Sequence, residues 1–312
     1  MLFAKSIYNM SNSKLSKADI KKQTGRVITR FGSDLLVSRE SEKPIRCTTK
    51  RKLDHAACGD YVLWQGNQHG NATVVKVLPR KNALTRQTYR GTPKTIAANI
   101  DQIIITSAWL PRPLWELVDR YLIAAQQLNA EAVIVINKSD LAEKQATDAD
   151  WKALQDYRDI GYKVIAINAM NSEGIDELSE LMQDKTNIFV GRSGVGKSSI
   201  AQHYLPNIKL LVNDISQSGE GQHTTTTATL YDLEMGGYLI DSPGVRDYVL
   251  DKLTTRKLSD GYIEFTNYVP YCRFNNCAHK HEPQCAVRTA VEKGKISPER
   301  YKRYLNALKN ID

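Results

Sequence analysis

The sequence predicts a multidomain chain with a small N-terminal β-barrel, a central parallel α/β domain and a C-terminal α-helical domain. Three observations predict it: short β-type runs fill the first part, buried strands alternate with helices from about residue 96, and a Cys/His cluster precedes a capped helix near the end. At 312 residues the chain is long enough for two or three hydrophobic cores. We expect a flexible basic arm at 1–22 and domains at 23–95, 96–260 and 261–312.

The N-terminal part contains β-type runs at Gly25–Thr29, Leu35–Val37, Tyr61–Trp64 and Ala72–Leu78. Their shortness and spacing indicate a barrel of about five strands, and this pattern does not separate an OB-fold from an SH3-like barrel. Residues 1–95 hold 19 Lys and Arg against 6 Asp and Glu, a balance of +13. Such a field attracts polyanions such as RNA or an anionic membrane.

The candidate RNA-facing residues of the barrel are basic and, more sparsely, aromatic. Such faces hold single-stranded RNA in OB-folds. With few aromatic residues, binding is expected to be mainly electrostatic and salt-dependent. The candidates are Lys50, Arg51, Lys52, Arg80, Lys81, Phe31, Tyr61, Trp64 and Tyr89.

The central part alternates strands and helices. Ile100–Thr106 and Ala132–Ile136 are apolar runs typical of strands buried on both faces, and Arg112–Leu128 repeats apolar residues at helical spacing. Further strands are expected at 163–167 and 187–190. This alternation predicts a parallel α/β sheet.

A glycine-rich loop after residue 190 has the strand-before, helix-after context of a phosphate-binding loop. Its glycines let successive backbone N–H groups surround phosphate oxygens. Lys197 is expected to reach the β- and γ-phosphates and is a candidate catalytic residue, while Ser198 is expected to bind Mg²⁺. The predicted nucleotide-binding residues of this loop are Gly191, Arg192, Ser193, Gly194, Val195, Gly196, Lys197, Ser198 and Ser199.

Two further motifs predict that the nucleotide is GTP. Asn137-Lys138-Ser139-Asp140 follows a strand and matches the guanine-specificity motif, since the Asp140 carboxylate can accept from guanine N1–H and N2–H₂. Alone, this tetrapeptide is also a good surface turn. Asp241-Ser242-Pro243-Gly244 closes another strand, so Asp241 is expected to hold Mg²⁺ through water and the Gly244 N–H to contact the γ-phosphate. Together the three motifs indicate a GTPase, but the guanine motif comes first instead of last.

This permuted order, with a barrel before it and a Cys/His cluster after it, resembles the RsgA family (also called YjeQ or EngC) of small-subunit-dependent ribosome-assembly GTPases. The resemblance extends from about Gly25 onward and includes the segments Ile96–Gln102, Gly221–Thr226 and Asp241–Asp247. It implies that the barrel is an OB-fold and the tail a zinc-binding domain. It also implies that GTP hydrolysis is stimulated by the small (30S) ribosomal subunit, in late maturation of that subunit through rRNA binding.

The resemblance also implies residue roles. Val245 stands where many GTPases have a water-positioning glutamine, and the family implicates a histidine in the loop before the threonines, here His223. On the residues alone, His223 is equally compatible with a plain polar loop position. Thr225, or its neighbour Thr224, is the candidate switch threonine on Mg²⁺. The segment that backs guanine, usually Ser-Ala, reads Asn168-Ala169, so Ala169 is carried as a nucleotide-binding residue.

The C-terminal cluster Cys272, Cys277, His279 and Cys285 supplies three thiolates and one imidazole within 14 residues. This is the ligand set of a closed, structural tetrahedral Zn²⁺ site. His281 is a competing histidine ligand. Cys47 and Cys58 are expected to be packed thiols, and an odd number of cysteines argues against a disulfide framework.

Composition excludes a membrane protein, because the sequence has no apolar run of about 20 residues and Met1–Lys22 has no apolar signal core. We therefore expect a cytoplasmic monomer that uses GTP/GDP, Mg²⁺ and one structural Zn²⁺. Its expected partner is the small ribosomal subunit, meaning 16S rRNA and nearby proteins. The alternatives are a nucleotide-gated RNA-binding module and a permuted GTPase acting on a different RNA or protein.

Overall fold

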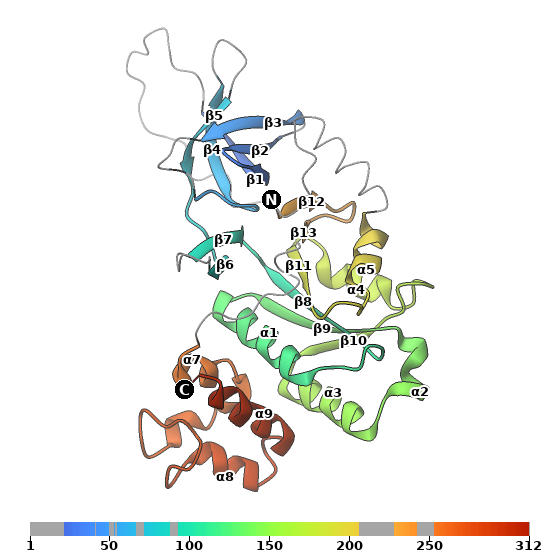
Figure 1. Cartoon of the computed structure of the whole chain (residues 1–312), viewed down its shortest axis with the longest axis vertical. Helices are drawn as coiled ribbons and strands as arrows, with labels where there is room; N and C mark the ends of the chain where they lie inside the picture. Colours follow the sequence, from blue (N-terminus) through green and yellow to red (C-terminus); the bar gives the residue numbers. More distant parts are fainter. Residues whose placement is uncertain are drawn as a thin grey trace.

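The computed structural model describes residues 22–40, 42–49, 53, 55–66, 72–87, 93–205, 228–241 and 253–311. These residues form a β-barrel, a central α/β domain and a helical C-terminal domain, which follow one another along the long axis of the molecule (Figure 1). The predicted three-part fold class is therefore confirmed.

The barrel consists of five short strands. They are β1 (Gln23–Phe31), β2 (Asp34–Arg39), β3 (Glu42–Thr49), β4 (Tyr61–Gly66) and β5 (Ala72–Val77). The strand order is β1-β2-β3-β5-β4, and β4 pairs back onto β1 to close the barrel. Only the β3–β5 pair is parallel. This five-stranded, closed Greek-key arrangement is that of an OB-fold, and it settles the alternative that the sequence pattern left open.

A two-stranded hairpin links the barrel to the central domain. It comprises β6 (Ala83–Gln87) and β7 (Pro93–Ala98), so β7 spans residue 95, where the barrel domain was expected to end. Leu84 and Ala97 of this hairpin are buried in the core of the central domain. The hairpin therefore packs with the central domain.

The central sheet has the order β10-β9-β8-β11-β13-β12, and its first five strands are parallel. β12 is antiparallel to β13 and also meets β1 of the barrel at the register pair Thr29 and Thr229, so the two sheets are continuous. The bounds are β8 (Gln102–Ala108), β9 (Glu131–Asn137), β10 (Lys163–Ala166), β11 (Thr186–Val190), β12 (Thr229–Asp232) and β13 (Tyr238–Asp241).

Helices cover both faces of this sheet, which explains why all seven residues of β8 are buried. Ile103 and Ile105 pack with α1 (Trp115–Leu128) and α3 (Asp148–Ile160), whereas Ile104 packs with α4 (Ile175–Met182) and α5 (Lys197–Tyr204). The short α2 (Ala142–Gln145) follows a 3-10 turn at Ser139–Leu141.

The C-terminal domain contains α7 (Thr255–Asp260), α8 (Ala286–Glu292) and α9 (Pro298–Lys309), with 3-10 turns at Ile263–Phe265 and Val269–Tyr271. Ser297 caps α9, because its side chain accepts from the Arg300 backbone N–H. Tyr304 and Leu308 of α9 are buried, and Ile123 of α1 joins the same core. The domain therefore sits directly on α1 (Figure 1). No helix in the described ranges is long and apolar enough to cross a bilayer.

Candidate functional site

The predicted phosphate, guanine and magnesium motifs meet at one edge of the central sheet. The glycine-rich loop follows β11, Asn137 ends β9 and Asp241 ends β13. Because these strands are parallel, their carboxyl ends share an edge, which is where open α/β sheets bind ligands.

Two glycines allow the phosphate-binding loop to lie against its neighbours. Gly191 has φ of 142°, and a Cβ there would lie 2.1 Å from the Thr106 carbonyl oxygen of β8. Gly196 has φ of 97°, and a Cβ there would lie 2.1 Å from the Asn137 Nδ2. A side chain at either position would thus be strained and would push the loop off its support.

Lys197 begins α5 and lies over the loop that precedes it. Its Nζ donates to the carbonyl oxygens of Gly191 at 2.5 Å and Arg192 at 2.7 Å. The ammonium group is therefore held beside the backbone that would surround a phosphate. The exposed Ser198 and Ser199 follow it in the first turn of α5, where the helix dipole favours an anion.

The guanine motif is tied to the phosphate-binding loop by two side chains. Asn137 donates from Nδ2 to the Val195 carbonyl oxygen at 2.9 Å and accepts at Oδ1 from the Ala169 backbone N–H at 3.1 Å. Lys138 donates from Nζ to the carbonyl oxygens of Gly194 at 3.0 Å and Leu110 at 2.5 Å. Asn137 and Lys138 thus connect the guanine motif to three other loops, which are the phosphate-binding loop and the loops at Ala169 and Leu110.

Asp140 has a partner that sequence reasoning did not identify. The Asn168 side chain donates from Nδ2 to Asp140 Oδ1 at 2.9 Å, and its own Oδ1 accepts from the Met170 backbone N–H at 3.0 Å. Asn168 was noted only as a departure from the usual serine. The available signal was chemical, because an amide can fix a carboxylate and bond its own loop at once.

The predicted magnesium and water-positioning residues are only partly described. Ser198 and Asp241 lie at the sheet edge, whereas His223, Thr224, Thr225 and Gly244 lie outside the described residues, as does Val245. Serine and carboxylate oxygens are hard donors that suit Mg²⁺. The described part of the site therefore fits the expected ion.

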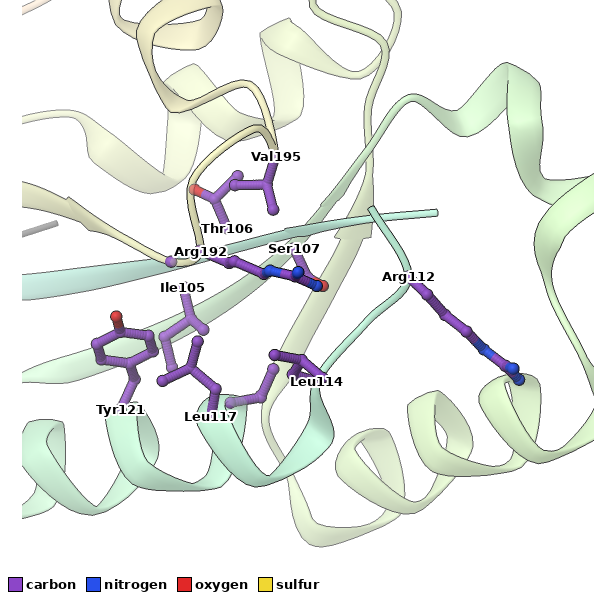
Figure 2. A pocket seen from close by; sticks show the side chains of 11 residues that line it. Ile105, Thr106, Ser107, Arg112, Leu114, Leu117, Tyr121, Arg192 and Val195 are labelled. Atoms are coloured by element: carbon purple, nitrogen blue, oxygen red, sulfur yellow. The ribbon is translucent and has the colours of Figure 1, made fainter. Parts of the chain in front are cut away.

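A small pocket lies between the phosphate-binding loop, the end of β8 and the start of α1 (Figure 2). Apolar side chains of Ile105, Leu117 and Tyr121 line it, and Arg192 of the loop extends over it. The pocket is adjacent to the phosphate-binding loop, so residues on α1 are close to the nucleotide site.

The four predicted zinc ligands converge. Their ligand atoms all lie within 4.8 Å of one another, with His279 Nδ1 3.6 Å from Cys272 Sγ and 3.5 Å from Cys285 Sγ. Thiolates bound at about 2.3 Å to one tetrahedral Zn²⁺ lie about 3.8 Å apart, and the Cys272 and Cys285 sulfurs are 4.0 Å apart. The cluster therefore fits Zn²⁺. His279 is buried among these atoms, whereas the competing His281 is exposed.

The surroundings of the cluster orient the histidine and favour neutral side chains as long as no cation is bound. Ser259 Oγ lies 3.1 Å from His279 Nε2, which leaves Nδ1 facing the thiols. Burial lowers the pKa of His279, which favours the neutral ligand form. Burial, together with the neighbouring cysteines, raises the pKa of Cys277 to about 12. A bound cation would supply the charge that these thiolates need.

Two of the expected RNA-facing residues of the barrel are paired with acids, and one is buried. Arg80 forms hydrogen bonds from Nε and Nη2 to both carboxylate oxygens of the buried Asp60, which fixes its guanidinium on the barrel, and the half-exposed Lys81 pairs with Asp101. Trp64 is 4% exposed and belongs to the barrel core, because it points to the same side of β4 as Val62. Phe31 and Tyr61 are exposed as expected, and residues 50–52 and Tyr89 lie outside the described residues.

The C-terminal domain carries exposed aromatic side chains that sequence reasoning did not select. Tyr271 is 79% exposed, and Phe274 is 39% exposed with the Arg273 guanidinium 5.4 Å from the centre of its ring. The two rings lie on either side of the predicted zinc ligand Cys272 in the sequence. An exposed ring beside a cation is a surface suited to stacking on unpaired bases.

The fold and the loops that Asn137 and Lys138 connect define a P-loop GTPase with circularly permuted motifs. Its GTPase domain lies between an OB-fold and a Cys/His domain. The model of the RsgA GTPase family matches residues 77–251. The chain belongs to this family.

Similar proteins and similar solved structures support the same family. A small ribosomal subunit biogenesis GTPase RsgA from Histophilus somni (strain 129Pt) is 42% identical over 287 residues, which cover 90% of this chain and 82% of the relative. One from Chromohalobacter salexigens is 43% identical over 285 residues, with coverages of 90% and 84%. The crystal structure of YjeQ from Thermotoga maritima has a TM-score of 0.76 at 29% identity, covering 93% of this chain and 99% of its own. That of YloQ, a circularly permuted GTPase, has a TM-score of 0.73 at 28% identity, with coverages of 96% and 98%.

Proposed function

We propose that this chain hydrolyses GTP to GDP and phosphate when it binds the small ribosomal subunit, and that it acts in late maturation of that subunit through rRNA binding. The observation that carries the proposal is the Asn137 side chain, which bonds both the phosphate-binding loop and the Ala169 backbone. This link holds the two loops at a fixed separation, as one ligand that occupies both loops would require. A phosphate at one end and guanine at the other satisfy this requirement.

Different residues of the site are assigned to the phosphates, the guanine and the Mg²⁺ ion. The loop 191–196 and the start of α5 hold the phosphates through backbone N–H groups, and Lys197 stabilises the charge on the β- and γ-phosphates. Asp140 and the Ala169 N–H select guanine. Ser198 and Asp241 would hold Mg²⁺, with Thr225 or Thr224 completing the set; when bound, the ion neutralises phosphate charge.

Water positioning is assigned to His223, because Val245 offers no hydrogen-bonding group where many GTPases have glutamine. An imidazole near neutral pH can orient a water molecule or accept its proton. Without a partner to order this arrangement, intrinsic turnover is expected to be slow. A bound subunit that orders this arrangement would therefore raise the rate of GTP turnover.

Two surfaces are proposed to contact rRNA: the basic barrel and the exposed Tyr271 and Phe274 beside the zinc cluster. Cys272, Cys277, His279 and Cys285 would hold a zinc ion with no open position for catalysis, and the bound ion would fix the shape of the second surface. Binding is expected to weaken steeply with salt. The chain is inferred to act as a monomer in the cytoplasm, where it would meet 16S rRNA and nearby proteins.

The test is GTP turnover with and without purified 30S subunits. We expect slow intrinsic turnover and a large increase at saturating 30S, with no increase from 50S subunits as the matched control. Slow turnover that 30S leaves unchanged, despite binding, would indicate a nucleotide-gated RNA-binding module. Failure to bind 30S at all would point to a different RNA or protein partner.

A further inference from the structure

A buried cluster of charges joins the C-terminal domain to α1 and α3 of the central domain. Asp119 of α1 accepts at Oδ1 from Arg300 Nη1 at 2.5 Å and from the Tyr157 hydroxyl at 2.5 Å. Its Oδ2 accepts from Arg303 Nε at 2.6 Å. Arg300 also pairs with Glu264 of its own domain. One carboxylate on α1 therefore binds two arginines of α9.

The cluster is buried, and its two arginines face two carboxylates. The Arg300 side chain is fully buried and that of Asp119 is 3% exposed. The Arg300 guanidinium also lies 5.1 Å from the Tyr157 ring and 4.7 Å from the Tyr262 ring, so both domains enclose it. Burial alone would lower the pKa of Arg300, but Asp119 and Glu264 raise it well above its ordinary value. The charges are therefore retained inside the junction.

The same helix reaches the nucleotide site. Asp119 lies one turn after Trp115, where α1 begins, and the loop before it carries Leu110, whose carbonyl oxygen accepts from Lys138 Nζ. The next residue, Pro111, has its ring next to Gly194 of the phosphate-binding loop, with 3.6 Å from Cδ to a Cβ built on that glycine. One helix thus contacts the C-terminal domain on one side and, through its leading loop, both nucleotide motifs on the other.

We propose that Asp119 is a positioning residue for the stimulated reaction. By holding Arg300 and Arg303, it fixes the C-terminal domain on α1, so that a subunit bound by that domain acts on the loop beside Lys138 and Gly194. The inference rests on the proposed function, because it concerns how subunit binding reaches the nucleotide. It assigns no chemistry to Asp119, which lies away from the reacting atoms.

The test compares Asp119→Asn with Glu299→Gln, a control on an exposed acid of α9 that pairs with the exposed Lys302 at 3.9 Å. Intrinsic turnover and GDP affinity of Asp119→Asn are expected to stay within about twofold of wild type. Turnover at saturating 30S should fall by about tenfold or more, within the usual range of coupling between sites. Glu299→Gln should be stimulated normally. Arg303→Met, at a less buried partner of Asp119, gives a second variant if Asp119→Asn does not fold.

The outcomes separate the inference from the proposed function. If wild type responds to 30S and Asp119→Asn responds equally, the positioning role is overturned. Full stimulation of the variant at high 30S concentration also overturns it, because Asp119 would then affect only affinity. If wild type itself does not respond, the proposed function fails. Hydrogen exchange then tests the junction alone. Faster exchange in α9 of Asp119→Asn supports the inference that Asp119 fixes the C-terminal domain on α1, and unchanged exchange contradicts it.

Discussion

The hydrogen bond from Asn168 to Asp140 shows how one side chain can prepare a base-recognition group. The Asn168 amide is fixed at both ends, since Nδ2 donates to Asp140 and Oδ1 accepts from the Met170 N–H. The Asp140 carboxylate is therefore already oriented before guanine arrives. A preoriented group loses less rotational freedom on binding, which favours affinity.

We predict that Asn168→Ala weakens GDP binding by about fivefold, the usual worth of one hydrogen bond. Asn168→Ser should retain most of the affinity, since a hydroxyl can also donate to the carboxylate. Asp140→Asn should lose preference for GTP over ATP, because its amide cannot accept from both guanine donors. Fluorescent-nucleotide titrations measure all three. Equal affinity of Asn168→Ala and wild type would show that Asp140 is oriented by other groups.

Motif residues could be placed from sequence because each motif is contiguous and ends a strand. The contact of Lys138 with Leu110 could not, because it joins loops 28 residues apart and depends on how β8 and β9 align. Trp64 was assigned to the surface wrongly, although the alternation in β4 places it with Val62 on the inner side. The Asn168 contact depends on a loop geometry that no local pattern specifies.

At the scale of elements, buried strands were the most predictable. β8 reads as a continuous apolar run, and the structure buries every residue of it. β3 was not identified, because it contains Pro44 and several polar residues and only Cys47 is fully buried. α3 was also not identified, although Thr147 and Asp150 form a capping box at its start. The pattern of polar and apolar residues did not identify β3 or α3, and both are recognised from the strands that they pair with or pack against.

The helices of the C-terminal domain have 6, 7 and 12 residues, so we expect a bound metal to add to the stability of the domain. We predict one Zn²⁺ per chain, and a far greater loss of zinc affinity for His279→Ala than the about 10- to 100-fold cost of removing a group that merely supports a ligand. His281→Ala is the matched control and should keep full zinc content, since His281 is exposed and outside the cluster. Metal analysis and Co²⁺ spectra of the purified variants measure this. Normal zinc in His279→Ala with loss in His281→Ala would reverse the assignment.

At the scale of the whole molecule, the three domains are joined by buried contacts at both junctions. β1 of the barrel pairs with β12 of the central sheet, and Asp119 holds the C-terminal domain on α1. Sequence reasoning delimited the domains by changes in pattern and charge. It did not predict the junctions, because arginines such as Arg26 and Arg300 are expected at the surface unless a specific partner from another domain buries them.

Arg26 contacts both the barrel and the central domain, so substituting it tests whether the two domains unfold together. It lies on β1 and is 4% exposed, with its guanidinium 5.0 Å from the Tyr61 ring of the barrel and 4.4 Å from the Tyr238 ring of β13. It also donates from Nη2 to Thr186 Oγ1 of β11 at 2.9 Å. β11 leads into the phosphate-binding loop, and β13 ends at Asp241, a predicted Mg²⁺ ligand.

We predict that Arg26→Ala lowers the free energy of unfolding by about 3 kcal/mol, because it leaves a cavity and unpaired buried acceptors at the junction. The barrel should then open separately, so amides of β1–β5 exchange faster while those of β8 and β9 change little. Arg39→Ala removes a barrel arginine paired with the exposed Glu42 and should cost less than about 1 kcal/mol. Urea unfolding and hydrogen exchange give both quantities. If exchange rises equally in the barrel and in β8 and β9, the two domains unfold as a single cooperative unit and Arg26 does not join separable bodies.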